Sequence, residues 1–179
     1  MLKHCKTLII ILPALVFISG CTIKVGQRKF SYSFNGAFFG TAKTASVQYF
    51  ENRAAMVQPT LALKLTDKLK DKIESQSPLK IVNGSNGDVN FEGSIERYYT
   101  EPTAVSGGET ATATLNRLTL TIQVKYTNST DPTFEYDTQF TRYVDYHSDM
   151  SLEQAESENL DGLVDLLVED IFNKAFVNW

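Results

Sequence analysis

Apolar and polar side chains alternate without a break between residues 117 and 126, the most regular pattern in the chain. Leucine, isoleucine, valine and tyrosine fill the even positions, while arginine, threonine, glutamine and lysine fill the odd ones. This period of two predicts a β-strand with one buried and one polar face. Residues 127–133 then predict a turn, and residues 134–146 predict a strand that returns beside the first.

The register of this hairpin can be predicted from its charges and its faces. Placing Tyr126 opposite Phe134 sets Lys125 against Glu135 and keeps the apolar and polar faces separate. A shift by one residue would mix the two faces, so we expect this register. Further along the hairpin it gives two pairs that involve an arginine, Arg117 with Tyr143 and Arg142 with Leu118.

Upstream, the pattern predicts a helix between two short strands. Residues 44–50 alternate in polarity and predict a strand. Pro59 and Thr60 then open a helix to about Ser75, in which leucine or isoleucine recurs at every fourth position. Residues 79–82 predict a second short strand. A strand, a helix and a strand in succession predict a parallel pair joined by a crossover.

The middle of the chain predicts a turn, a strand and a loop in succession. Asparagine, glycine and aspartate dominate residues 83–88, so we expect a reversal of the chain there. Residues 89–99 predict a strand. Residues 101–114 contain two adjacent glycines and few apolar side chains, and we interpret them as a loop.

The chain ends in a second helix with one apolar stripe. Between Leu160 and Phe176 the apolar residues recur at spacings of three and four, and acidic residues occupy the opposite face. Such a stripe is typical of a helix packed on a sheet, not of a membrane span. Ser151 and Gln154 resemble a capping box ahead of it. The elements together predict an α+β fold, a mixed β-sheet of four to five strands with two helices packed on one face, in a single domain over residues 44–179.

The first 20 residues are typical of a lipoprotein signal peptide. Two lysines precede a mostly apolar run over residues 7–18, which is too short to span a bilayer. The sequence Ile18-Ser19-Gly20-Cys21 then predicts cleavage before Cys21, which would carry a diacylglycerol and an N-acyl chain. Residues 21–43 are interpreted as a lipidated tether and a short extended segment. The alternative is an ordinary signal peptide followed by a cysteine that is there by chance.

Composition and charge argue against several classes of function. Loss of the leader removes two of the 17 basic residues and none of the 21 acidic ones, which leaves a net charge of −6 and argues against nucleic-acid binding. His147 would be the only histidine of the mature chain, and no free cysteine would remain, so we expect no metal site and no cofactor besides the lipid. His147, Ser148 and Asp149 are adjacent, whereas working triads are assembled from separate segments. We therefore expect a protein that is not an enzyme.

Several segments of the mature chain resemble one known family. They are Tyr32-Ser33-Phe34-Asn35-Gly36-Ala37, Val47-Gln48-Tyr49-Phe50-Glu51-Asn52-Arg53-Ala54, Pro59-Thr60-Leu61, Leu65-Thr66-Asp67-Lys68-Leu69-Lys70-Asp71-Lys72, Gly87-Asp88-Val89-Asn90-Phe91-Glu92-Gly93, Asn116-Arg117-Leu118-Thr119 and the ending 168–179. In this order they resemble the lipopolysaccharide-assembly lipoprotein (LptE) family. The stretch between Cys21 and Tyr32 is longer than in its relatives.

The resemblance implies a non-enzymatic protein on the periplasmic side of the outer membrane. It would fill the lumen of the LptD β-barrel, support assembly of that barrel, and assist transport of lipopolysaccharide to the outer leaflet. Thr22 and the acid-free residues 23–25 agree with this location, because they resemble neither retention nor export signals. The alternatives are a free periplasmic lipid- or ligand-binding lipoprotein, and a cell-wall hydrolase accessory enzyme. The first requires an apolar cavity, and the second an acid–base pair that the pattern does not provide.

Lipopolysaccharide phosphates would need basic side chains held together on this acidic protein. The expected register brings Arg117 and Arg142 to one end of the sheet, and the arginine fork suits phosphate. Arg97 and Lys125 are further candidates. The structural alternative is that Arg117 stacks on Tyr143, and that Arg142 only covers the core with its aliphatic stem.

Overall fold

The computed structural model describes residues 37–106 and 112–177. The predicted signal peptide, Cys21 and most of the predicted tether lie outside the described residues, as does Trp179. The helices and strands run in the order β1 (Thr44–Val47), β2 (Glu51–Asn52), α1 (Leu61–Gln76), β3 (Lys80–Ile81), β4 (Val89–Ser106), β5 (Thr112–Asn128), the 3-10 helix Pro132–Phe134, β6 (Tyr136–His147) and α2 (Leu152–Phe176).

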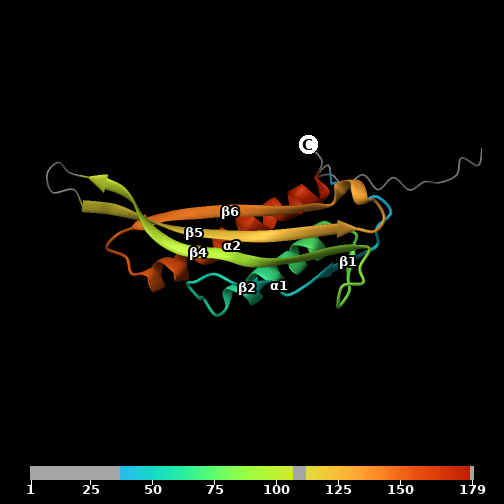
Figure 1. Cartoon of the computed structure of the whole chain (residues 1–179), viewed down its shortest axis with the longest axis horizontal. Coiled ribbons are helices and arrows are strands. Elements are labelled where there is room, and N and C mark those ends of the chain that lie inside the picture. Colours follow the sequence, from blue (N-terminus) through green and yellow to red (C-terminus); the bar gives the residue numbers. More distant parts are fainter. Residues whose placement is uncertain (1–36, 107–111, 178–179) are drawn as a thin grey trace, which may run out of the picture. The chain divides into compact units, whose positions relative to one another are not determined.

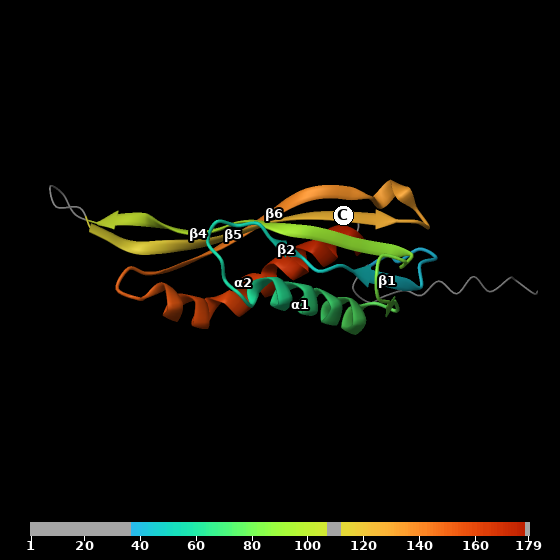
Figure 2. The same cartoon turned by 60° about the horizontal axis from the view of Figure 1, so that its bottom comes forward.

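The strands form one mixed sheet, and both helices pack on the same face of it (Figure 2). The strand order is β3-β1-β4-β5-β6, and β2 also pairs with β4. The predicted α+β fold class and the two-helix layer are therefore confirmed. The sheet has six strands because the chain segment expected as one strand near residue 50 divides into β1 and β2, which pair with successive parts of β4.

The predicted strand–helix–strand unit is present, since β1 and β3 are parallel and α1 connects them. The parallel ladder continues to β4, which lies on the other side of β1. The chain after β3 must therefore cross over β1 before β4 begins. Gly87 allows this crossing, because a Cβ at residue 87 would lie 2.6 Å from the backbone nitrogen of Ser46.

The expected loop over residues 101–114 is wrong, because β4 continues to Ser106 and β5 already begins at Thr112. Antiparallel pairing reaches Ser106 and Thr112, with register shifts near Ile95 and Pro102. This ribbon of two strands runs beyond the helices (Figures 1 and 2), and Glu101, Pro102 and Thr103 are exposed on it. Because this part of the ribbon lies beyond the helices, its strands need no apolar face. The low apolar content therefore suggested a loop, although the two strands are paired.

The expected hairpin register is also wrong, by two residues. Tyr126 pairs with Tyr136 instead of Phe134, because the 3-10 helix Pro132–Phe134 lengthens the connection. Asp131 caps this turn by accepting a hydrogen bond from the backbone N–H of Thr133 at 3.1 Å. A shift of two residues preserves the face of every side chain, so the division into an apolar and a polar face is correct although the partners are not.

The core lies between the apolar sheet face and the two helices. The stripe predicted for the last helix is buried, and the Ser151–Gln154 capping box is formed, so α2 begins at Leu152. One end of the core is aromatic: the Tyr126 ring lies 4.9 Å from that of Phe91 and 5.3 Å from that of Tyr136 between centroids. Lysines of α1 join the helices, since Lys64 contacts Asp161 at 2.6 Å. The buried apolar side chains form one continuous cluster, which we expect to provide most of the domain's stability.

Asp88 links the start of β4 to β1 through hydrogen bonds. We expect these bonds to make the stability of the fold sensitive to acid. Its carboxylate accepts hydrogen bonds from the backbone N–H of Lys43 at 2.8 Å, the hydroxyl of Thr44 at 2.9 Å and the N–H of Thr44 at 3.0 Å. These bonds hold the pKa of Asp88 below its ordinary value. The stabilisation is complete above the pKa of the unfolded state, about 3.9, and disappears as the pH falls through the lower folded-state pKa.

The substitution Asp88→Asn should lower the melting temperature at pH 7 and flatten its decline in acid. Thermal unfolding followed between pH 2 and 7 measures both effects. Asp67→Asn, an exposed change on α1, is the matched control and should leave the acid profile unchanged. Identical acid profiles for the wild type and Asp88→Asn would contradict the assignment.

Candidate interaction face of the sheet

The sheet face opposite the helices, called the outer face here, is polar and internally hydrogen-bonded. The hydroxyls of Thr121 and Thr141 lie 3.0 Å apart across β5 and β6. Gln123 donates to Asp137 on the same pair of strands. Toward β4, Lys125 forms an ion pair with Glu92 at 2.8 Å. The outer face is therefore a cross-linked polar surface, in which most side chains already have a partner on the neighbouring strand.

Arg117 is held on the outer face by a carboxylate and an aromatic ring. Its Nε donates to Asp145 at 2.7 Å, and its Nη2 donates to the second oxygen at 2.9 Å. The guanidinium carbon lies 3.7 Å from the centroid of the Tyr143 ring. The hydrogen bond to Asp145 raises the pKa of Arg117, and its counterpart lowers the pKa of Asp145. The structural alternative predicted for Arg117, stacking on Tyr143, is confirmed.

Arg142 lies on the opposite side of the sheet. It pairs with Leu120 on the core-facing side of β5, and its Nε and Nη2 both donate to Asp170 of α2 at 2.6 Å. The expected grouping of Arg117 with Arg142 is therefore wrong, because an odd-numbered and an even-numbered position of this hairpin face opposite ways. Arg142 instead joins the edge strand to the last helix.

Lys125 and Arg97, the two further candidates, differ in whether the side chain already has a carboxylate partner. Lys125 is engaged by Glu92, whose hydrogen bond raises the pKa of the lysine. Arg97 is exposed on β4 opposite Thr121, and it forms no ion pair with any other described residue. Sequence reasoning missed the carboxylates Asp145, Asp170 and Glu92, which decide how available each cation is. A register shifted by two residues pairs Arg117 with Asp145. This match of opposite charges is the signal in the sequence that could have identified Asp145.

The remaining chemistry of the described ranges is sparse. No group of three or more histidine, cysteine or acidic side chains there could hold a metal ion. His147 is exposed at the end of β6, and the chain turns after it, with the N–H of Met150 donating to the His147 carbonyl at 3.0 Å. Among residues 37–106 and 112–177, neither helix has the length and apolar character needed to cross a membrane.

An open mixed sheet with one helical layer defines a two-layer α+β protein. Its polar outer face is a surface suited to contact with another molecule. Comparison with known families gives the assignment. Residues 42–175 match the family model LptE, described as lipopolysaccharide-assembly. The chain therefore belongs to the LptE lipopolysaccharide-assembly family, and the resemblance expected from the sequence is confirmed.

Solved structures agree on the fold. The chain is similar to protein XCC0632 from Xanthomonas campestris, with a TM-score of 0.52 and 11% identity over 76% of this chain and 84% of that one. It is also similar to hypothetical protein CT253 from Chlamydia trachomatis, with a TM-score of 0.50 and 6% identity over 76% and 99% of the two chains.

A minor lipoprotein from Acinetobacter baumannii has a TM-score of 0.48 and 15% identity over 74% of this chain and 91% of that one. No curated protein matched the chain.

Proposed function

We propose that this protein is a lipoprotein, anchored through Cys21 to the periplasmic side of the outer membrane, that fills the lumen of an LptD-like β-barrel. There it would support assembly of the barrel and transport of lipopolysaccharide to the outer leaflet. Membership of the LptE family implies the role in lipopolysaccharide assembly. The barrel partner, the anchor and the location are inferred from the sequence features and from what that family implies.

The observation that supports the barrel most directly is the character of the outer face. The lumen of a large barrel is polar, so a plug needs a polar surface that loses little solvation free energy when it leaves bulk water. On the outer face Arg117 and Lys125 are already neutralised by carboxylates, and the threonine hydroxyls of β5 and β6 are hydrogen-bonded. Such a face can meet a polar wall without leaving Arg117 or Lys125 unpaired.

The substitution Gln139→Arg tests this contact. Gln139 is exposed on the outer face of β6, opposite Gln123, so an arginine there adds bulk and a positive charge while the core stays intact. We expect at least about tenfold less barrel to copurify with the full-length lipoprotein in detergent, which corresponds to about 1.4 kcal/mol of lost affinity. The melting temperature of the lipoprotein should be unchanged.

Leu63→Arg is the matched control, since Leu63 is 54% exposed on the helical layer and the change adds the same charge. It should leave copurification intact. Loss of the barrel with Leu63→Arg alone would move the contact to the helices. Recovery of the wild-type lipoprotein with lipid and no barrel would instead favour the free lipid-binding lipoprotein.

Direct contact with lipopolysaccharide is proposed for Arg97 first among the four basic candidates. Arg117, Arg142 and Lys125 would each have to give up a carboxylate, whereas Arg97 would not. Arg97→Glu should weaken binding of purified lipopolysaccharide to the isolated lipoprotein about two- to fivefold, as expected for an exposed ion pair. Arg117→Gln should have the smaller effect. Undiminished binding by Arg97→Glu would remove this contact.

A further inference from the structure

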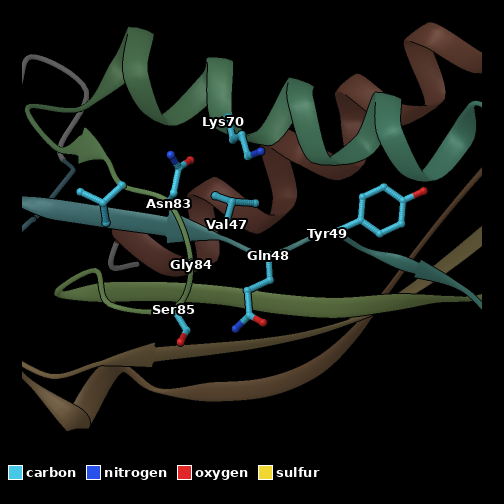
Figure 3. A pocket seen from close by; sticks show the side chains of 8 residues that line it. Val47, Gln48, Tyr49, Lys70, Asn83, Gly84 and Ser85 are labelled. Carbon is cyan, nitrogen blue, oxygen red and sulfur yellow. The ribbon is translucent and has the colours of Figure 1, made fainter.

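An open cleft of about 380 Å³ lies along the free edge of β1 (Figure 3). Its boundaries are the end of β1 and the residues that follow it, Lys70 of α1, and residues 82–85, which leave β3 to cross over β1. Polar groups line most of it. The cleft exists because β3 has only two residues and pairs with β1 at Thr44 and Ala45 alone.

The edge of β1 in this cleft has unused hydrogen-bonding positions. Gln48 donates its backbone N–H to Phe91 of β4 at 2.9 Å, and Ala45 accepts on the other side from Val82 at 2.8 Å. Backbone groups of a strand alternate between its two neighbours, so those of Val47 point to the β3 side. No described residue forms a backbone hydrogen bond with Val47 on that side. A strand longer than β3 would be needed to pair there.

Charge in the cleft is also unbalanced. Lys64 and Lys68 of α1 form ion pairs with Asp161 and Asp165 of α2. Lys70 is half-buried at the cleft and pairs with no carboxylate among the described residues, and no acidic side chain lines the cleft. A ligand with a negative group would therefore complement it.

We propose that this cleft binds an extended peptide segment of a partner polypeptide, which adds to β1 as a short parallel or antiparallel strand and places an acidic side chain against Lys70. A peptide fits because only a backbone supplies donors and acceptors at the spacing of a strand edge. A simple anion would satisfy Lys70 and leave the Val47 carbonyl unpaired. This site is independent of the outer face and of the barrel contact proposed above.

Fluorescence anisotropy with a labelled peptide tests the proposal on the full-length chain in detergent. The probe is an acetylated Thr-Val-Glu-Val-Thr amide, and a second peptide carries lysine in place of the glutamate. Lys70→Glu should weaken binding of the glutamate peptide about two- to fivefold and should favour the lysine peptide by a similar factor. Lys80→Glu, an exposed change on β3 outside the cleft lining, should alter neither.

Hydrogen exchange separates strand addition from a simple charge contact. The bound glutamate peptide should slow exchange of the Val47 amide, and the same peptide methylated on alternate backbone nitrogens should neither bind nor protect it. Equal binding of the methylated peptide would overturn the proposal. Protection of Val47 by inorganic phosphate alone would also overturn it, because the cleft would then be an anion site.

Discussion

Replacing Phe172 with alanine is expected to lower the free energy of unfolding by about 3–5 kcal/mol, the range for a phenylalanine removed from a packed core. Phe172 is 2% exposed and lies on the buried stripe of α2. Its ring meets that of Phe176 edge to face, with 5.1 Å between centroids, and the Lys72 ammonium lies 5.8 Å from its centroid. Removing the ring therefore leaves a cavity between the two helices and the sheet.

Thermal unfolding of residues 22–179 measures the effect. The melting temperature should fall by about 6–20 °C, from about 2–4 °C per kcal/mol in a chain of this size. Leu166→Ala is the control on the same helix, because Leu166 is 48% exposed and should cost far less. Equal melting curves for the wild type and Phe172→Ala would mean that this part of α2 does not contribute to the core.

Replacing Cys21 with alanine is expected to abolish lipid attachment completely. The thiol of Cys21 is the only group that could form the thioether after cleavage at the predicted site, so no other residue can substitute for it. Cells that express Cys21→Ala should incorporate no labelled palmitate into the protein. The protein should also be absent from the outer-membrane fraction or retain its leader.

Cys5→Ala is the matched control, because Cys5 is the other cysteine of the chain and lies within the predicted leader. It should be labelled and sorted normally. Normal palmitate labelling of Cys21→Ala would refute the lipoprotein assignment. Digestion of the domain by protease added to intact cells would refute its placement on the periplasmic side.

Local patterns determined most of the secondary structure. The period of two over residues 117–126 and the three- and four-residue spacing of the last helix each follow from the need to bury one face. Thr60 and the capping box at Ser151 marked where the helices begin. The predicted leader and the predicted lipidation site at Cys21 likewise rest on local signals. These features could be predicted because each depends only on a residue and its near neighbours in the sequence.

Pairing between strands was predicted less well, because it depends on contacts between distant segments. In the expected register Lys125 met Glu135, whereas the observed register sets Lys125 against Asp137 and Arg117 against Asp145. Both registers keep the faces separate, so polarity could not distinguish them. The 3-10 helix after β5 decided between them.

The sequence by itself determined the class of fold, the buried face of each long element and the family to which the chain belongs. Only the tertiary structure decided which cations are free. Arg117, Arg142 and Arg97 look alike in sequence, yet the first meets Asp145 across a hairpin and the second meets Asp170 on a helix. Arg97 meets no carboxylate among the described residues. Ion pairing falls off within a few ångströms, so the availability of each arginine depends on chain segments that the fold brings together.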